Sequence, residues 1–250
     1  MKNENNEKRI GDAQSDTAAF YEVAYANEGF GAQRRYPNEE LMRFLGRRYF
    51  STPHDLRSSV SILDVGCGSG ANLWPIAREG FDAYGVDISQ HGLALCKEML
   101  SSFAVGATLR VASMCELPFD DGSLSAVVDV FSSNCLTTKE HLKFISEVCR
   151  VLKPGGRFFS YHPSKASDAF IDFAPADKLD NDTLDGIRRP TAPFFGNFYP
   201  FRFLTTREYA AELEASNLKV TYLETVGRTY RNGSEYFEFV TIEGESFGYI

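Results

Sequence analysis

The sequence lacks the features that mark several classes of protein. Its five cysteines, Cys67, Cys96, Cys115, Cys135 and Cys149, are odd in number and widely spaced, and no two of them form a CxxC pair. This pattern argues against a disulfide framework and against a structural zinc site. No apolar run reaches the roughly 18 residues of a membrane span, and the polar first residues do not resemble a signal peptide. We therefore expect a cytoplasmic protein without a metal site.

A stripe of basic residues is also missing. The chain has 26 Lys and Arg against 34 Asp and Glu, which gives a formal charge of −8. Proteins that bind nucleic acid normally carry a basic surface, whereas here basic residues gather only in neighbouring arginine pairs such as Arg34 and Arg35. The composition therefore favours a small-molecule substrate over DNA or RNA.

Apolar, strand-like segments alternate with helical ones from about residue 60 to residue 162. Such alternation predicts an α/β fold with a doubly wound, mostly parallel sheet and helices on both faces. A ligand then lies beyond the carboxyl ends of the strands. At 250 residues, the chain suits one such domain with a large core.

The rest of the chain surrounds this predicted sheet. We expect a disordered tail at residues 1–16 and a helical cap at residues 17–58, followed by the main domain at residues 59–250. Within that domain, residues 163–204 lose periodicity and gather prolines and aromatics, which predicts a lid or a partner surface. A final helix and a C-terminal β-hairpin follow this segment.

Local signals mark several of the predicted helix starts and turns. Asn38 is a plausible helix N-cap, and the pairs Thr137–Glu140 and Thr205–Glu208 each match a capping box. Asn232 and Gly233 match a hairpin turn.

The most specific pattern is ILDVGCGSG, residues 62–70, which follows an apolar segment and precedes a predicted helix at 71–78. Its glycines, Gly66, Gly68 and Gly70, allow a tight turn and a close approach of backbone N–H groups to a ligand. Asp87 lies 21 residues after Gly66, where a carboxylate can accept hydrogen bonds from ribose hydroxyls. The pattern predicts a nucleotide pocket. It also fits the GxGxxG/A motif of dinucleotide sites, so the residues alone leave the nucleotide open.

Within this run, DVGCGSG resembles the first motif of class I S-adenosylmethionine-dependent methyltransferases. Four further segments resemble the same family, and the first of them, GVDIS at 85–89, resembles the family's ribose motif. The remaining segments that are similar to this family, in the expected order, are LPFDDGSLSAVV at 117–128, EVCRVLKPGGRF at 147–158 and TTREYAAELEASNLKV at 205–220. The resemblance covers roughly residues 60–220. It implies a seven-stranded sheet, S-adenosylmethionine as cofactor and S-adenosylhomocysteine as product.

The resemblance also implies roles for individual residues. Asp64 would lie near the amino group of the cofactor, Asp87 at the ribose, and Ile88 against the adenine. Ser113 stands where the family often has an aspartate that reads the adenine amino group, so this contact is reduced to one hydrogen bond. The full set of implied cofactor residues is Asp64, Gly66, Cys67, Gly68, Gly70, Asp87, Ile88, Ser113, Met114, Phe131 and Ser132.

The acceptor side is less defined. We expect a small molecule with an acceptor hydroxyl, such as a sugar or a natural product, and methylation of nitrogen or of a carboxyl group is the alternative. His162, at the end of the fifth predicted strand, is the candidate general base because histidine titrates near neutral pH. The candidate substrate residues are Tyr21, Tyr25, Arg34, Arg35, Tyr36 and Asn134.

Two other functions remain as alternatives. A protein that binds S-adenosylmethionine without catalysis would keep the same motifs. A nicotinamide-dependent oxidoreductase would use the GxGxxG/A match, and YHPSK at 161–165 has the YxxxK spacing of short-chain dehydrogenases. Pro163 within that string argues against the helix that this spacing needs. A homodimer formed through residues 163–204 is a further hypothesis.

Overall fold

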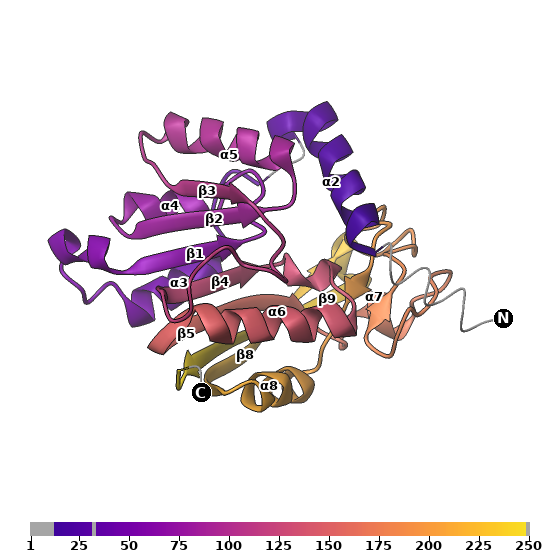
Figure 1. The fold of residues 1–250 in the computed structure, drawn as a ribbon. Helices are drawn as coiled ribbons and strands as arrows, with labels where there is room; N and C mark the ends of the chain where they lie inside the picture. The colour runs from indigo at the N-terminus through magenta and orange to yellow at the C-terminus, as the bar shows by residue number, and fades with distance from the viewer. Residues whose placement is uncertain (1–12, 32–33, 249–250) are drawn as a thin grey trace.

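A central seven-stranded sheet organises the molecule. The computed structural model describes residues 13–31 and 34–248, and its main sheet has the strand order β3-β2-β1-β4-β5-β9-β8 (Figure 1). Strands β1 to β5 pair in parallel, and β9 runs antiparallel to both β5 and β8. The strands are β1 Ser61–Val65, β2 Asp82–Asp87, β3 Thr108–Val111, β4 Leu124–Val130, β5 Leu152–Pro163, β8 Leu218–Tyr230 and β9 Glu235–Ser246. The predicted doubly wound α/β fold is confirmed.

Helices cover both faces of the sheet because successive strand residues point to opposite sides. Ile62 packs in one apolar cluster with α3, α4 and α5, whereas its neighbour Leu63 packs in another with α6 and α8. Phe159 and Phe158 divide between the clusters in the same way. The helices are α2 Ala13–Glu28, α3 Glu39–Arg48, α4 Leu73–Arg78, α5 Gln90–Ser102, α6 Thr138–Val151, α7 Asp168–Ile171 and α8 Thr206–Ala215.

The local start signals of the helices are confirmed. The Asn38 side chain accepts hydrogen bonds from the backbone of Glu40 and Leu41 at the start of α3. Capping boxes begin α6 at Thr137 and α8 at Thr205. The turn between β8 and β9 is formed by η4, Arg231–Gly233, as the hairpin motif predicts.

The first helices differ from the predicted boundaries. Helix α2 begins at Ala13, inside the segment expected to be a tail, and residues 1–12 lie outside the described part of the chain. Helix α4 begins at Leu73 rather than at residue 71, because residues 69–72 form turns after the glycine run. None of the helices in the described ranges is long and apolar enough to cross a bilayer.

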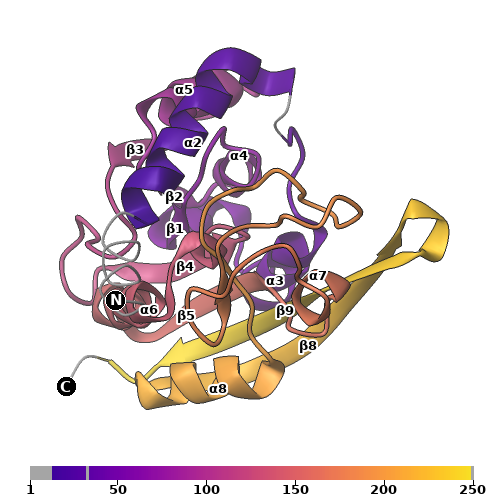
Figure 2. The same ribbon diagram turned by 90° about the vertical axis from the view of Figure 1, so that its right-hand side faces the viewer.

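Residues 163–204 fold into loops with the short helix α7 and a two-stranded sheet, β6 Thr183–Leu184 and β7 Phe201–Arg202. Figures 1 and 2 place this segment and α2 at the end of the sheet toward which the parallel strands point. Several of its aromatic side chains are buried, including Tyr199, Phe201 and Phe203. The segment is anchored by Arg202, whose buried guanidinium pairs with Asp182 at 3.2 Å and with Glu212 of α8 at 2.5 Å.

His162 lies in the core and not at an open strand end. Its side chain is 0% exposed and points toward α6 and α8, where its ring lies 5.4 Å from the rings of His141 and Tyr209. The sequence-based placement of this histidine in the site is therefore corrected. Successive strand residues point to opposite faces of the sheet. Tyr161 therefore lies on the sheet face that packs against α3 and against residues 163–204, hereafter the insertion, and His162 lies on the other face.

Strand β9 and helix α3 are joined by ion pairs to a buried carboxylate. The Glu243 side chain of β9 is 0% exposed, and its two carboxylate oxygens accept hydrogen bonds from Arg47 and Arg48 of α3, each with a shortest distance of 2.6 Å. Removing one partner of a buried pair leaves the other charges uncompensated.

We expect Glu243→Gln to lower the free energy of unfolding by about 2 to 3 kcal/mol, because both arginines lose their anionic partner. Urea denaturation of the purified protein measures this loss. The matched control is Glu214→Gln on the exposed side of α8, which should change stability by less than about 0.5 kcal/mol. A loss at Glu243 no larger than that of the control would contradict the prediction.

A second prediction concerns acid stability. Burial lowers the pKa of His162 well below its ordinary value, and the neighbouring His141 and Arg202 lower it further. Below about pH 6.5 the unfolded chain binds a proton that folded His162 does not, so the free energy of unfolding falls by up to about 1.4 kcal/mol per pH unit. His162→Gln should make the decline between pH 6.5 and pH 5 shallower by about that amount in urea titrations. His54→Gln, at an exposed position, should leave the decline as steep as in the wild type.

Candidate active site

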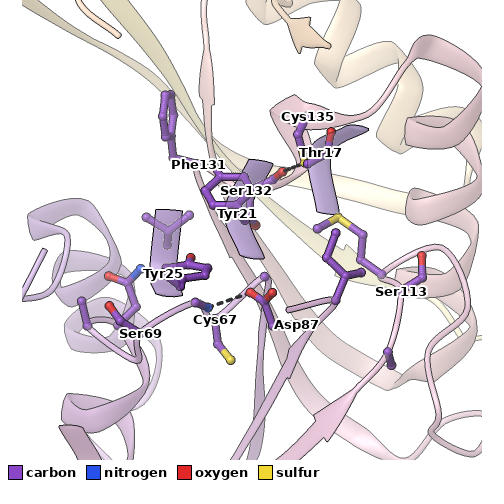
Figure 3. Close-up of a pocket in the computed structure, with 18 of the residues that line it drawn as sticks. Thr17, Tyr21, Tyr25, Cys67, Ser69, Asp87, Ser113, Phe131, Ser132 and Cys135 are labelled. Atoms are coloured by element: carbon purple, nitrogen blue, oxygen red, sulfur yellow. Dashed lines mark hydrogen bonds between the residues drawn. The ribbon is translucent and has the colours of Figure 1, made fainter. Parts of the chain in front are cut away.

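A cavity of about 220 Å³ lies at the carboxyl ends of β1, β2 and β4 (Figure 3). Its walls come from the glycine run, from the loops after β2, β3 and β4, and from α2. The structure brings together nine of the expected cofactor residues in this lining: Gly66, Cys67, Gly68, Asp87, Ile88, Ser113, Met114, Phe131 and Ser132. Ligands of doubly wound sheets bind at this edge of the fold.

Asp87, the last residue of β2, is held by backbone N–H groups from two other segments. Gly68 N–H and Ser89 N–H each donate to one of its carboxylate oxygens at 2.8 Å, and in Figure 3 the side chain lies between Cys67 and Ser113. Burial raises the pKa of Asp87, and the hydrogen bonds from Ser89 and Gly68 oppose this rise. Because two carboxylate oxygens offer about four lone-pair sites, this carboxylate can still accept two hydroxyl groups.

The three glycines of the run at residues 62–70 lie where a Cβ atom would be too close to neighbouring atoms. Gly66 has φ +62°, and a Cβ atom there would lie 2.5 Å from Cβ of Ser132. Gly68 has φ +49°, and its Cβ atom would lie 2.6 Å from the hydroxyl oxygen of Tyr25. Gly70 does not line the cavity and instead packs against Cys96 of α5. The first two glycines therefore leave room at the cavity wall, and the third allows close packing with a helix.

Asp64 lies beneath the glycine run and outside the cavity lining. Its side chain is 1% exposed, and one of its carboxylate oxygens has no hydrogen-bond partner among the described residues. Burial raises its pKa well above the usual range, and the nearby carboxylates of Asp129 and Asp87 add to the effect. Of these three carboxyl groups, only that of Asp87 borders the cavity.

The loop after β4 forms the wall opposite Asp87. Phe131 adopts φ 58°, and its N–H donates to the carbonyl of Tyr161 at 2.9 Å. The Ser132 hydroxyl donates to the carbonyl of Val65 at 2.7 Å and lies 2.6 Å from Asp129 Oδ1. Asp129 also accepts hydrogen bonds from Ser133 N–H at 2.9 Å and from the Ser160 hydroxyl at 2.8 Å. This buried carboxylate holds the wall in one conformation.

The part of the cavity formed by the loop after β3, where we expect the adenine, contains few polar groups. Ser113 lines the cavity, and its hydroxyl oxygen accepts a hydrogen bond from Cys115 N–H at 3.1 Å. Its neighbours in the lining, Ile88, Ala112 and Met114, present mainly apolar atoms. The side chains at this end therefore offer one hydroxyl and an apolar surface.

Helix α2 closes the cavity from above. Tyr21 and Tyr25 stack with ring centroids 5.7 Å apart, and the Tyr21 hydroxyl hydrogen-bonds with that of Tyr199 in the insertion at 2.8 Å. Sequence reasoning predicted Tyr21 and Tyr25 but missed other residues of the lining, among them Thr17, Ser69, Asn72, Cys135 and Leu136. For α2 a signal was present, because Thr17, Tyr21 and Tyr25 recur every four residues and so share one helix face.

The residues predicted for the acceptor divide into two groups. Tyr25 and Arg34 line the cavity, whereas Arg35, Tyr36, Asn134 and His162 do not. Tyr36 is 70% exposed, and Asn134 is buried in η3, Ser133–Cys135. The guanidinium of Arg35 lies over the ring of Phe30 at 5.4 Å. No cluster of metal-binding side chains occurs among the residues that the structure describes.

Comparisons with known proteins agree with this geometry. Residues 62–156 match the model of a family described as "Methyltransferase domain". A demethylmenaquinone methyltransferase of Tropheryma whipplei is 38% identical over 97 residues, which are 38% of this chain and 38% of that protein. The chain therefore aligns with well under half the length of that curated relative.

Solved structures extend the likeness over most of the chain. A protein of Pyrococcus horikoshii has a TM-score of 0.66 at 19% identity and covers 88% of this chain and 99% of its own. A Burkholderia thailandensis 1,6-didemethyltoxoflavin-N1-methyltransferase, solved with S-adenosylhomocysteine bound, has a TM-score of 0.61 at 12% identity over 96% of this chain and 86% of its own. At these identities the likeness shows the fold. Residues 62–156 are therefore a methyltransferase domain, and the chain around them has the fold of S-adenosylmethionine-dependent methyltransferases.

Proposed function

We propose that this protein transfers the methyl group of S-adenosylmethionine to a small-molecule acceptor. The observation that carries the proposal is the buried Asp87 carboxylate, which two backbone N–H groups hold at the cavity wall with lone pairs left for ribose hydroxyls. When bound, S-adenosylmethionine supplies an activated methyl group on a sulfonium. The protein then has to bind, align and desolvate the reactants.

The cavity residues suggest how this cofactor would be held. Asp87 would take the ribose, and Ile88, Ser113 and Met114 would contact the adenine. Gly66, Cys67, Gly68, Phe131 and Ser132 would border the methionine part. Asp64, below the glycine run, would not contact the cofactor directly, because it does not reach the cavity itself.

For the acceptor, we propose an oxygen that is acidic enough to ionise without a strong base from the protein. The described lining contains no histidine, and burial raises the pKa of Tyr21 and of Cys135, so both stay protonated near neutral pH. A phenol or a carboxyl group meets this condition better than a sugar hydroxyl.

Two measurements separate this function from its alternatives. Calorimetric titration with S-adenosylmethionine, S-adenosylhomocysteine and NAD reports which nucleotide binds. Formation of S-adenosylhomocysteine in the presence of phenolic and carboxylic acids reports turnover. Binding of NAD alone would support an oxidoreductase, and binding of S-adenosylmethionine without turnover on any acceptor would support a non-catalytic binding protein.

We expect Asp87→Ala to raise the Kd of S-adenosylmethionine at least about tenfold, because hydrogen bonds from the ribose to a charged group are lost. Asp82→Ala is the matched control, since Asp82 is an exposed aspartate at the other end of β2. Its Kd should stay within about twofold of the wild type. Unchanged affinity in Asp87→Ala would refute the assignment of the ribose site.

A further inference from the structure

The main sheet ends in a long edge strand. Among the residues that the structure describes, β8 pairs with β9 on one side and with no strand on the other. It has 13 residues, whereas β3 at the opposite edge has 4. Figure 2 shows the β8–β9 hairpin extending past the loops of the insertion. A long edge presents a row of backbone N–H and C=O groups without sheet partners, to which a further strand can bind.

The outer part of β8 is regular enough to pair with such a strand. Its register shift lies between Val220 and Tyr222, and from Tyr222 to Tyr230 each residue pairs in turn with β9. This stretch contains no proline, and most of its residues are Tyr, Thr or Val, which favour strands. Residues 223–229 are exposed except for Val226, which is half-buried. The stretch therefore lacks the bulge and the proline that protect many sheet edges.

Two charges on this stretch have no oppositely charged partner in the described part of the chain. Glu224 and Arg228 are both exposed, and across the hairpin they face Thr241 and Phe237. Glu224 accepts a hydrogen bond from the Tyr222 hydroxyl, which is a neutral partner. Four residues of strand place the two charges about 13 Å apart, so they do not neutralise each other. Each charge remains available to a second molecule.

The residues from Tyr222 to Tyr230 are complementary to themselves in the antiparallel direction. When a second copy pairs about a two-fold axis through Val226, Tyr222 faces Tyr230. Glu224 then faces Arg228 on both sides of the axis. Facing residues of antiparallel strands lie on the same side of the sheet, so each Glu–Arg pair can form. An axis through Glu224 or through Arg228 would instead place like charges opposite each other.

We propose that this protein forms a homodimer in which the β8 strands of two copies pair antiparallel about Val226. The two sheets join into one, and the free backbone groups of both edges are satisfied. Each copy supplies a Glu224 to the other's Arg228, so the interface is two-fold symmetric and closes at two chains. The described cavity lining contains no residue of β8. This inference therefore does not depend on the proposed function.

Sedimentation equilibrium of the wild-type protein measures the Kd of the dimer. We expect a Kd of about 1 to 100 µM, because the stretch from Tyr222 to Tyr230 supplies fewer residues than the roughly 20 to 30 a side of a standard interface. A protein that stays monomeric up to about 1 mM would overturn the inference.

Charge reversal tests the register of the dimer. Glu224→Arg and Arg228→Glu should each raise the Kd of the dimer about tenfold or more, because each change turns both Glu–Arg pairs into like-charge pairs. An equimolar mixture of the two variants should associate within about threefold of the wild type, since every arginine then faces a glutamate. The double variant, Glu224→Arg with Arg228→Glu, should dimerise equally well by itself.

The matched control is Lys97→Glu, which reverses an exposed charge on α5, beside β2 and β3 at the other side of the sheet. Its Kd should stay within about twofold of the wild type. Thermal unfolding checks that every variant folds, and Glu224→Gln or Arg228→Gln replaces any that does not, with an expected rise in Kd of about threefold.

Two further results overturn the inference. A dimer whose Kd ignores both charge reversals is held by another surface, such as the insertion. A mixture of the two variants that stays as weakly associated as each variant alone shows that Glu224 does not face Arg228 of the second copy.

Discussion

The hydrogen bonds from Gly68 N–H and Ser89 N–H to the Asp87 carboxylate connect three parts of the fold. They join the end of β2 to the glycine run after β1 and to the start of α5, whose N-cap Ser89 accepts a hydrogen bond from Gly92 N–H. A buried carboxylate is costly unless it is hydrogen-bonded. The glycine run that this junction holds also lies close to two other walls of the cavity, since Gly66 approaches Ser132 and Gly68 approaches Tyr25.

The features that could be predicted from sequence depend on residues close together in the chain. A glycine run between a strand and a helix, followed by an acid at the end of the next strand, is a local pattern that places its own ligand. The caps at Asn38, Thr137 and Thr205 are equally local, and all three form as predicted. The hydrogen bonds of a helix cap involve only residues of the first turn, so long-range packing does not override them.

The features that sequence could not supply depend on packing between distant segments. Tyr161 and His162 are neighbours on β5, and their side chains point to opposite faces of the sheet. The order of helices and strands in the sequence does not tell which of these faces borders the site. The Tyr21–Tyr199 contact joins residues 178 positions apart and requires the insertion to fold against α2. Helix α2, which lines the cavity, and the insertion that it contacts both lie outside the matched methyltransferase domain.

The contact between α2 and the insertion also has a consequence for temperature. The hydrogen bond between the Tyr21 and Tyr199 hydroxyls contributes only about 1 kcal/mol net, because water replaces it when the two segments separate. The edge-on and tilted ring contacts of Phe20 and Tyr21 with Tyr199 therefore contribute most of the closure, and they are apolar in character. Apolar association weakens on cooling. The cover over this cavity is thus held more weakly in the cold than the hydrogen-bonded glycine run beneath it.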